Sequence, residues 1–193
     1  DLKRRIRVIM GTDEESGSSC VAYYKERKQE LPVAGFTPDA CFPVIFCEKG
    51  CLVLEIGCEL SKETLGRLQK FRGGTAPNVV MEEFEIHMLT EGGSCSLYKK
   101  GKSAHAAAPS LGINAGVAAA KELAQVRLAP EIDDMMRFIA DYIGDETQGK
   151  GLGIDYTDEE TGCVSVNLGI LGIREGRAYL TLDIRYPNNA DPE

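Results

Sequence analysis

Residues 163–187 read CVSVNLGILGIREGRAYLTLDIRYP, and this stretch decides the fold of the second part of the chain. Its two halves, 163–171 and 177–186, are rich in apolar and β-branched residues, which predicts two strands of a hairpin. Pro187 ends the second strand, because proline cannot donate a ladder hydrogen bond. Alternation along this strand would place Asp183, Arg185 and Pro187 on one face.

The region upstream of this hairpin continues the same kind of pattern. The residues Glu91, Gly92 and Gly93 separate two strand-like runs and have the composition of a hairpin turn. Between the runs lie stretches of helical composition. We therefore predict an α+β domain, an antiparallel sheet backed by helices. Its strands are expected at 51–58, 79–89 and 94–99, its helices at 61–70, 113–126 and 131–143, and a long polar loop at 145–161.

The first part of the chain has a different pattern. A β-rich run at 5–11 precedes a helical stretch at 16–29, with Ser16 as its cap, and a second apolar run follows at 43–47. This order predicts a β-α-β piece of an α/β domain. The composition changes near residues 48–50, so we expect two domains, 1–49 and 50–193. Because both ends look like cuts within domains, we expect the chain to be an interior piece of a longer protein.

Composition and charge exclude several classes of function. The chain has 193 residues, with 22 Lys and Arg against 30 Asp and Glu, and its net charge of −8 argues against nucleic-acid binding. No apolar run is long enough for a membrane span, and no secretory signal opens the chain. None of the seven cysteines forms a Cys-x-x-Cys pair. We interpret them as buried structural residues of a cytoplasmic protein.

An acidic cluster lies between the first predicted strand and helix, in GTDEESG at 11–17. Ligands bind at the carboxyl ends of strands in α/β sheets. Adjacent residues on an extended loop point in different directions, so one of Glu14 and Glu15 can face a metal ion and the other its bound water. Asp39 precedes the next predicted strand at the same sheet edge. The alternative is that acidic residues at a helix start only complement the helix dipole.

Three residues of the second part are candidates for substrate contacts. Asn78 follows a glycine turn in GGTAPN, His105 lies among small residues in GKSAHA, and Arg185 lies in DIRYP. Each also has a structural interpretation. Asn78 could stabilise its turn, His105 could be a hydrogen-bonded structural histidine, and Arg185 could pair with a cross-strand acid. His87, the other histidine, lies in a strand-like run and is interpreted as structural.

The motifs together carry a family resemblance over nearly the whole chain. GTDEESG followed by GFTPDACFPVIFCEKG resembles the metal-site segment of PepV-type dipeptidases, within the aminoacylase/carboxypeptidase-like zinc exopeptidases. GG-x-A-x-N, GKSAHA and DIRYP are similar to the motifs of the lid that closes over the substrate in these enzymes. The resemblance implies a zinc-dependent dipeptidase, with residues 1–49 in its catalytic domain and 50–193 in its lid.

The same resemblance implies a role for each candidate residue. Glu14 would be the catalytic base. Glu15 would bind one zinc ion and Asp39 the other. Asn78 and His105 would donate hydrogen bonds to the oxyanion of the tetrahedral intermediate. Arg185 would bind the C-terminal carboxylate of a dipeptide or short peptide.

The chain also departs from the family pattern. The His-x-Asp motif, the bridging Asp and the final ligand His of the family are absent from these residues. One carboxylate per zinc is then left, whereas catalytic zinc sites have three protein ligands. We therefore expect the complete enzyme to bind two zinc ions, and this chain alone neither to hold both nor to be active.

Two alternatives to a dipeptidase stay open at this point. The first is a deacylase or an aminopeptidase of the same family, which shares the metal chemistry. The second is a noncatalytic association module, since related lids dimerise by joining sheet edges. A doubled lid predicts a monomer, and a single lid predicts a homodimer.

Overall fold

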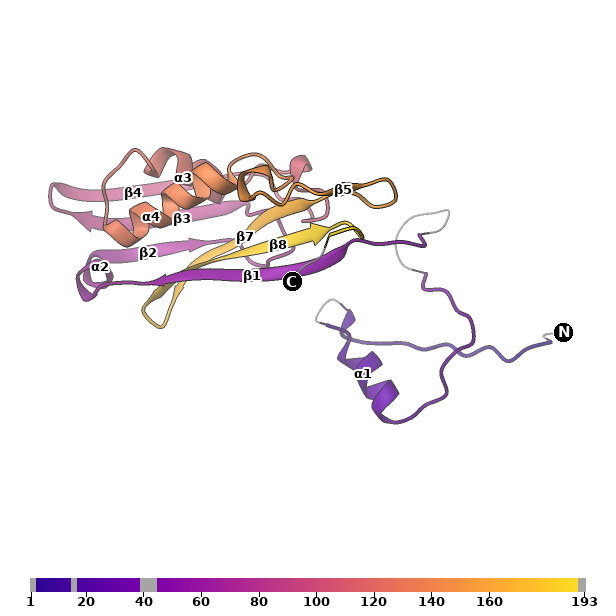
Figure 1. Ribbon diagram of the computed structural model, residues 1–193. Coiled ribbons are helices and arrows are strands. Elements are labelled where there is room, and N and C mark those ends of the chain that lie inside the picture. Colours follow the sequence, from indigo (N-terminus) through magenta and orange to yellow (C-terminus); the bar gives the residue numbers. More distant parts are fainter. Residues whose placement is uncertain (1–2, 15–16, 39–44, 191–193) are drawn as a thin grey trace. The chain divides into compact units, whose positions relative to one another are not determined.

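The computed structural model describes residues 3–14, 17–38 and 45–190 (Figure 1). The chain divides into two compact units, Asp1–Ile45 and Phe46–Glu193. We describe each unit by itself, and the assignment of residues 1–49 and 50–193 to a catalytic domain and a lid remains a prediction. None of the helices in the described residues is long and apolar enough to cross a membrane.

Helix α1, at Ser19–Glu26, is the α-helix in the described residues of the first unit. The helix is shorter than the predicted 16–29 and buries none of its residues; Ser16, its predicted cap, lies outside the described residues. The strand predicted at 5–11 is wrong, because these residues form no ladder, and neither do 45–47. A strand needs a neighbour for its N–H and C=O groups, and the described residues of this unit include no other strand.

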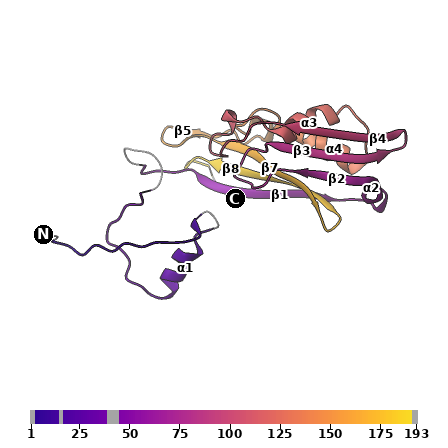
Figure 2. The same ribbon diagram turned by 180° about the vertical axis from the view of Figure 1, so that it is seen from behind.

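The second unit is an antiparallel six-stranded sheet in the order β1-β8-β7-β2-β3-β4. Helices α3 (Ala115–Leu123) and α4 (Pro130–Phe138) and the π-helical turn η3 (Ile139–Ile143) lie on one side of it (Figures 1 and 2). The predicted α+β class, an antiparallel sheet backed by helices, is confirmed. The strands are β1 Gly50–Glu59, β2 Leu68–Gly73, β3 Glu83–Thr90, β4 Gly93–Lys100, β7 Ser165–Arg174 and β8 Arg177–Tyr186.

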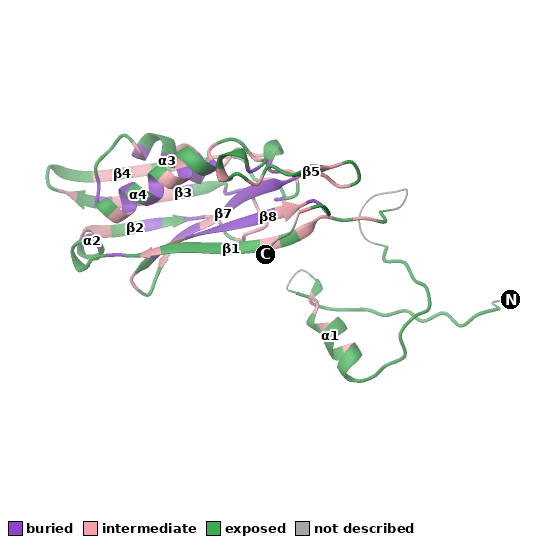
Figure 3. Cartoon of the chain, in the orientation of Figure 1, coloured by how far each residue is buried: buried purple, intermediate pink, exposed green. Residues whose placement is uncertain are grey.

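The hydrophobic core lies between the sheet and the helices. Buried residues concentrate on β7 and β8, whereas the edge strand β1 is largely exposed (Figure 3). Leu168 and Leu182 are each 1% exposed, and Ile132 and Met136 of α4 are fully buried in the same cluster. Burial of such side chains is the main contribution that holds helices and sheet together.

Three element boundaries differ from those expected. The helix predicted at 61–70 ends early as α2 (Lys62–Arg67), because the next residues pair with β3 as strand β2. The strand predicted at 79–89 begins only at Glu83, and the residues before it form a loop. The predicted loop 145–161 contains the short helix η4 (Lys150–Leu152) and strand β5 (Thr157–Asp158), which pairs with β6 (Gly162–Cys163).

Asn114 connects the start of α3 to the middle of β7. Its Oδ1 accepts hydrogen bonds from the N–H groups of Gly116 and Val117, which caps the helix. Its Nδ2 donates to the carbonyl oxygen of Leu168 at 2.8 Å. The β7–β8 register shifts directly after Leu168, so this bond holds α3 at an irregular point of the strand.

Glu131 connects α4 to α2 and makes the stability of this unit depend on pH. Its carboxylate accepts hydrogen bonds from the Ser61 N–H at 2.8 Å and the Thr64 hydroxyl at 2.9 Å. Its own backbone N–H, then that of Ser61, lower its pKa to about 2. The carboxylate therefore stabilises the fold above its ordinary pKa of 4.5, and this contribution is lost as the pH falls toward 2.

Replacing this carboxylate should remove both effects. We expect Glu131→Gln to lower the free energy of unfolding by about 1 kcal/mol at neutral pH, and to flatten its decline between pH 4.5 and pH 2. Urea unfolding at a series of pH values measures both quantities. Glu91→Gln, in the exposed turn between β3 and β4, is the matched control. Equal pH dependence in the wild type and Glu131→Gln would contradict this role.

Candidate functional site

Asp13, the first residue of the acidic cluster, caps helix α1. Its Oδ2 accepts a hydrogen bond from the Ser19 N–H at 2.7 Å, and its Oδ1 accepts one from the Cys20 N–H at 3.1 Å. Hydrogen bonding from Cys20 and then from Ser19 holds the pKa of the Asp13 carboxyl well below its usual range. Asp13 therefore fits the structural alternative, in which an acidic residue stabilises the start of the helix.

Glu14 is in a different situation from Asp13. It is exposed, and its side chain makes no hydrogen bond to any residue that the structure describes. A carboxylate that is free of structural partners can accept a proton from a substrate or a water molecule. Glu15 and Asp39, the two predicted zinc ligands, lie outside the described residues.

Within residues 3–14, 17–38 and 45–190, no three His, Cys, Asp or Glu side chains come together in a way that could hold a metal ion. A catalytic zinc site takes three protein ligands. The described side chains alone therefore do not make up such a site.

Asn78 and His105 lie on two segments that pair with each other. Val79 and His105 form an isolated antiparallel bridge. On either side of it, the Ala106 N–H donates to the Asn78 carbonyl at 2.9 Å and the Val80 N–H to the Ala104 carbonyl at 2.8 Å. The segments of two residues predicted to act together, 27 positions apart, thus lie side by side, with Val79 opposite His105 and Asn78 opposite Ala106.

His105 is exposed, and its imidazole is oriented by a neighbouring backbone group. The Ala107 N–H donates to His105 Nδ1 at 3.1 Å. A neutral imidazole has one donor and one acceptor nitrogen, so acceptance at Nδ1 assigns the proton to Nε2. His105 therefore presents an N–H donor at Nε2, which makes no hydrogen bond within the described part of the chain.

Arg185 makes a bidentate ion pair with Asp183 on its own strand. Its Nε donates to Asp183 Oδ1 at 2.6 Å and its Nη2 to Oδ2 at 3.1 Å, and the Asp183 hydrogen bond raises the pKa of Arg185. The Asp183 side chain is 1% exposed and the Arg185 side chain 24%. The acid that pairs with Arg185 thus lies on the same strand, and not on a neighbouring strand as the structural alternative expected. Arg185 Nη1 has no hydrogen-bond partner among the described residues and can still bind a carboxylate.

Strand β7 connects these three groups. Its Ser165 lies opposite Arg185 in the β7–β8 register, and its Asn167 lies opposite Asp183. The Ser165 hydroxyl donates to the Ala106 carbonyl at 3.1 Å. Asn167 Nδ2 donates to the carbonyl oxygens of Pro77 and Val79. The backbone segments that carry Asn78 and His105 therefore contact the first residues of β7, and Arg185 lies opposite Ser165 on β8.

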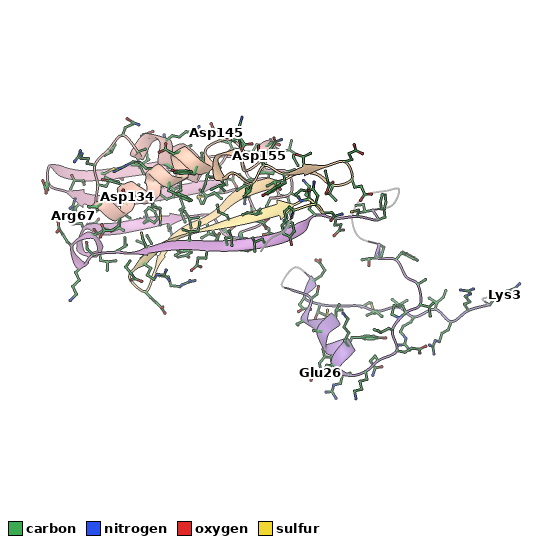
Figure 4. All side chains as sticks on the ribbon, viewed as in Figure 1. Lys3, Glu26, Arg67, Asp134, Asp145 and Asp155 are labelled. Carbon is green, nitrogen blue, oxygen red and sulfur yellow. The ribbon has the colours of Figure 1, made fainter. Side chains whose placement is uncertain are left out.

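The polar residues of β7 face away from the helices. Leu168 packs near Gly116 of α3, and side chains alternate along a strand, so Ser165 and Asn167 point to the other face. The charged residue Asp134 of α4, labelled in Figure 4, belongs to the helix-covered side. The signal that sequence reasoning missed is the pair of polar residues at alternate positions of an otherwise apolar run, SVNLG.

Curated relatives give this geometry a context. "Putative dipeptidase YtjP" of Bacillus subtilis (strain 168) is 33% identical in an alignment of length 219 that covers 98% of this chain and 47% of YtjP. A "Putative dipeptidase" of Staphylococcus epidermidis is 29% identical, over 97% of this chain and 46% of its own length. "Putative dipeptidase SAB1611c" of Staphylococcus aureus is 28% identical, over 100% and 48%. All three are named as dipeptidases.

The extent of these matches matters as much as their names. The chain is aligned almost from end to end, but it spans about half the length of the curated relatives that it matches. No family model matches the chain. The similarity therefore supports a peptidase function at the level of the relatives' names, and the reaction of the whole protein is a matter for proposal.

Proposed function

We propose that this chain belongs to a metallodipeptidase that hydrolyses dipeptides or other short peptides, and that residues 50–193 form most of its lid. The observation that carries the proposal is the pairing of the Asn78 and His105 segments, with His105 Nε2 assigned as a free N–H donor. The similarity to proteins named as dipeptidases supports the same reaction.

The proposed roles follow from what each side chain has available. His105 Nε2–H and the Asn78 amide donate hydrogen bonds to the oxygen that becomes negative in the tetrahedral intermediate, a stabilisation of about 3 kcal/mol per donor in known hydrolases. Arg185 binds the free carboxylate of the substrate through Nη1, while Asp183 holds the other edge of the guanidinium. Glu14 accepts the proton of the attacking water.

Zinc is the proposed cofactor, with Glu15 and Asp39 as one ligand for each of two ions. We propose that the other ligands come from outside these 193 residues, because the His-x-Asp motif, the bridging Asp and the final ligand His of the family pattern are not among them. The cytoplasm is the proposed location, since six cysteines of the described part are free thiols.

The proposal is tested by zinc content and dipeptide hydrolysis, measured on this chain and on the longer protein that we propose contains it. We expect the longer protein to bind two zinc ions and to hydrolyse dipeptides, and the 193-residue chain to be nearly metal-free and inactive. Faster hydrolysis of N-acyl amino acids or longer peptides would assign a deacylase or an aminopeptidase instead. If the short chain held two zinc ions and turned over, the ligand assignment would be wrong.

A noncatalytic association module is the second candidate, and one observation favours it. Strand β1 is an edge strand that exposes Val53, Leu54 and Ile56, and such an edge can pair with another strand. Light scattering of the chain separates a monomer from a homodimer. A dimer, together with a longer protein that cleaves no peptide or N-acyl amino acid, would favour this candidate over the enzyme.

A further inference from the structure

We propose that Asn167 is a positioning residue that holds Asn78 and His105 in place, and that Ser165 assists it. The effect on catalysis rests on the proposed function. We call the hydrogen bonds from Asn167 and Ser165 to the two segments the clamp. The clamp does not rest on the proposed function, and it can be measured in the chain without any substrate.

The geometry around Asn78 carries the proposal. Asn167 is 2% exposed, and its Nδ2 donates to the Pro77 carbonyl at 2.8 Å and to the Val79 carbonyl at 3.0 Å. The carbonyl between them, that of Asn78, accepts the Ala106 N–H. Three consecutive carbonyls thus have donors, which fixes the backbone on both sides of Asn78. Its side-chain amide makes no hydrogen bond within the described part of the chain and stays available for a substrate.

Ser165 extends the same support to His105. Its hydroxyl donates to the carbonyl of Ala106, a fully buried residue directly after His105. The N–H of the same Ala106 residue donates to Asn78. One strand, β7, therefore holds both segments, and Ala106 joins them to each other. Displacing either segment would move both proposed oxyanion donors.

Close backbone packing shows that the Asn78 segment rests on β7. A Cβ on Gly169 would lie 2.5 Å from the Cα and the carbonyl oxygen of Pro77. A Cβ on Gly74, whose φ is +74°, would lie 1.8 Å from the Gly169 carbonyl oxygen. Neither position has room for a methyl group, so the glycines allow the contact that Asn167 then secures.

Only a carboxamide suits this position. One Nδ2 group carries two N–H donors, which is the number needed for the two carbonyls beside Asn78. A carboxylate of the same shape has no donor when ionised and would repel both carbonyl oxygens. Asn167→Asp therefore removes both donors with almost no change of volume. It also places a second carboxylate opposite the buried Asp183, so the uncharged Asn167→Ala is measured beside it.

The test is amide hydrogen exchange by NMR on the 193-residue chain. We expect both Asn167→Asp and Asn167→Ala to speed exchange at Val80 and Ala106 at least tenfold, while the buried Ile86 in the middle of β3 exchanges as in the wild type. The imidazole ¹⁵N shifts give a second readout. The chain has only two histidines, so His87→Gln assigns the signals, and the variant should weaken the bond at His105 Nδ1.

Thr181→Val is the matched control. Thr181 is a buried β8 residue, 6% exposed, and its hydroxyl has no hydrogen-bond partner among the described residues. The substitution nearly keeps the side-chain volume and replaces only that hydroxyl with a methyl group. It should leave exchange at Val80 and Ala106, and the His105 ¹⁵N shifts, unchanged.

If Asn167→Asp folds and its Val80 and Ala106 amides exchange at the wild-type rates, the clamp is refuted. If that variant did not fold, Asn167→Ala would decide for Asn167 by the same exchange rates. Ser165→Ala removes one hydrogen bond and tests the part of Ser165, with severalfold faster exchange expected at Ala106. In the longer protein, Asn167→Asp should lower kcat for dipeptides at least tenfold with little change in KM, since the donors act on the transition state. Faster exchange in the chain, with no dipeptide hydrolysis by the wild-type longer protein, would refute the proposed function and leave the clamp standing.

Discussion

Replacing Arg185 by alanine is expected to lower the free energy of unfolding of the 193-residue chain by about 3–5 kcal/mol. The reason lies in its partner. The Asp183 side chain is 1% exposed, and both of its oxygens accept hydrogen bonds from Arg185. Without the guanidinium, a carboxylate that is almost fully buried loses its charged partner. An exposed ion pair, by comparison, contributes only about 0–1 kcal/mol.

Urea unfolding at neutral pH measures this cost, and a double-mutant cycle assigns it. Asp183→Asn combined with Arg185→Ala should recover much of the lost stability, because no buried charge is then left unpaired. Arg174→Ala is the control, since Arg174 pairs with Glu55 on the exposed edge, where the two side chains are 58% and 39% exposed. A loss below 1 kcal/mol for Arg185→Ala, equal to that control, would contradict the argument.

This result changes how the proposed substrate role of Arg185 should be tested. The sequence alone predicts that Arg185→Ala mainly raises KM for free-carboxylate substrates. The ion pair means that Arg185→Ala also destabilises the end of β8 that carries the residue. Arg185→Lys keeps a positive charge next to Asp183 but loses the planar fork, so it is the better variant for measuring KM with free-carboxylate substrates.

The antiparallel sheet was predictable because its strands have clear local patterns. The final hairpin, expected at 163–171 and 177–186, is observed at Ser165–Arg174 and Arg177–Tyr186. Its apolar runs pack against α3 and α4, so composition and burial agree. The run at 5–11 has a similar local composition but forms no strand, because a strand depends on a partner that the described part of the first unit does not provide.

The candidate site was only partly predictable, because its parts meet through tertiary contacts. The sequence could indicate Asn78, His105 and Arg185 one by one, but not the bridge that joins the first two. The polar residues of β7 were hidden in an apolar run. The role of Asn167 becomes visible only in the folded structure, where its amide donates hydrogen bonds to the carbonyls of Pro77 and Val79, about 90 positions away. A single sequence has no local signal for such a contact.

Glu14 is the residue for which we expect the largest effect on rate. Of the two described carboxylates in the acidic cluster, Asp13 is occupied at the start of α1, whereas Glu14 is exposed and makes no hydrogen bond to a described residue. A general base must be free to accept a proton, and this is why we propose Glu14 for the role. In the longer protein, Glu14→Gln should lower kcat for dipeptides by about 10²–10⁴-fold.

The amide of Glu14→Gln has nearly the same size as the carboxylate but cannot accept the proton, so zinc content, KM and thermal stability should stay close to those of the wild type. Asp13→Asn provides the contrast. It weakens the acceptor for the first N–H groups of α1 and should act first on the stability of that helix. A kcat near the wild-type value for Glu14→Gln would remove Glu14 from the mechanism. If Asp13→Asn alone caused a large loss of kcat, Asp13 would be the general base in place of Glu14. The two carboxylates differ chiefly in that Asp13 already accepts hydrogen bonds from the start of α1.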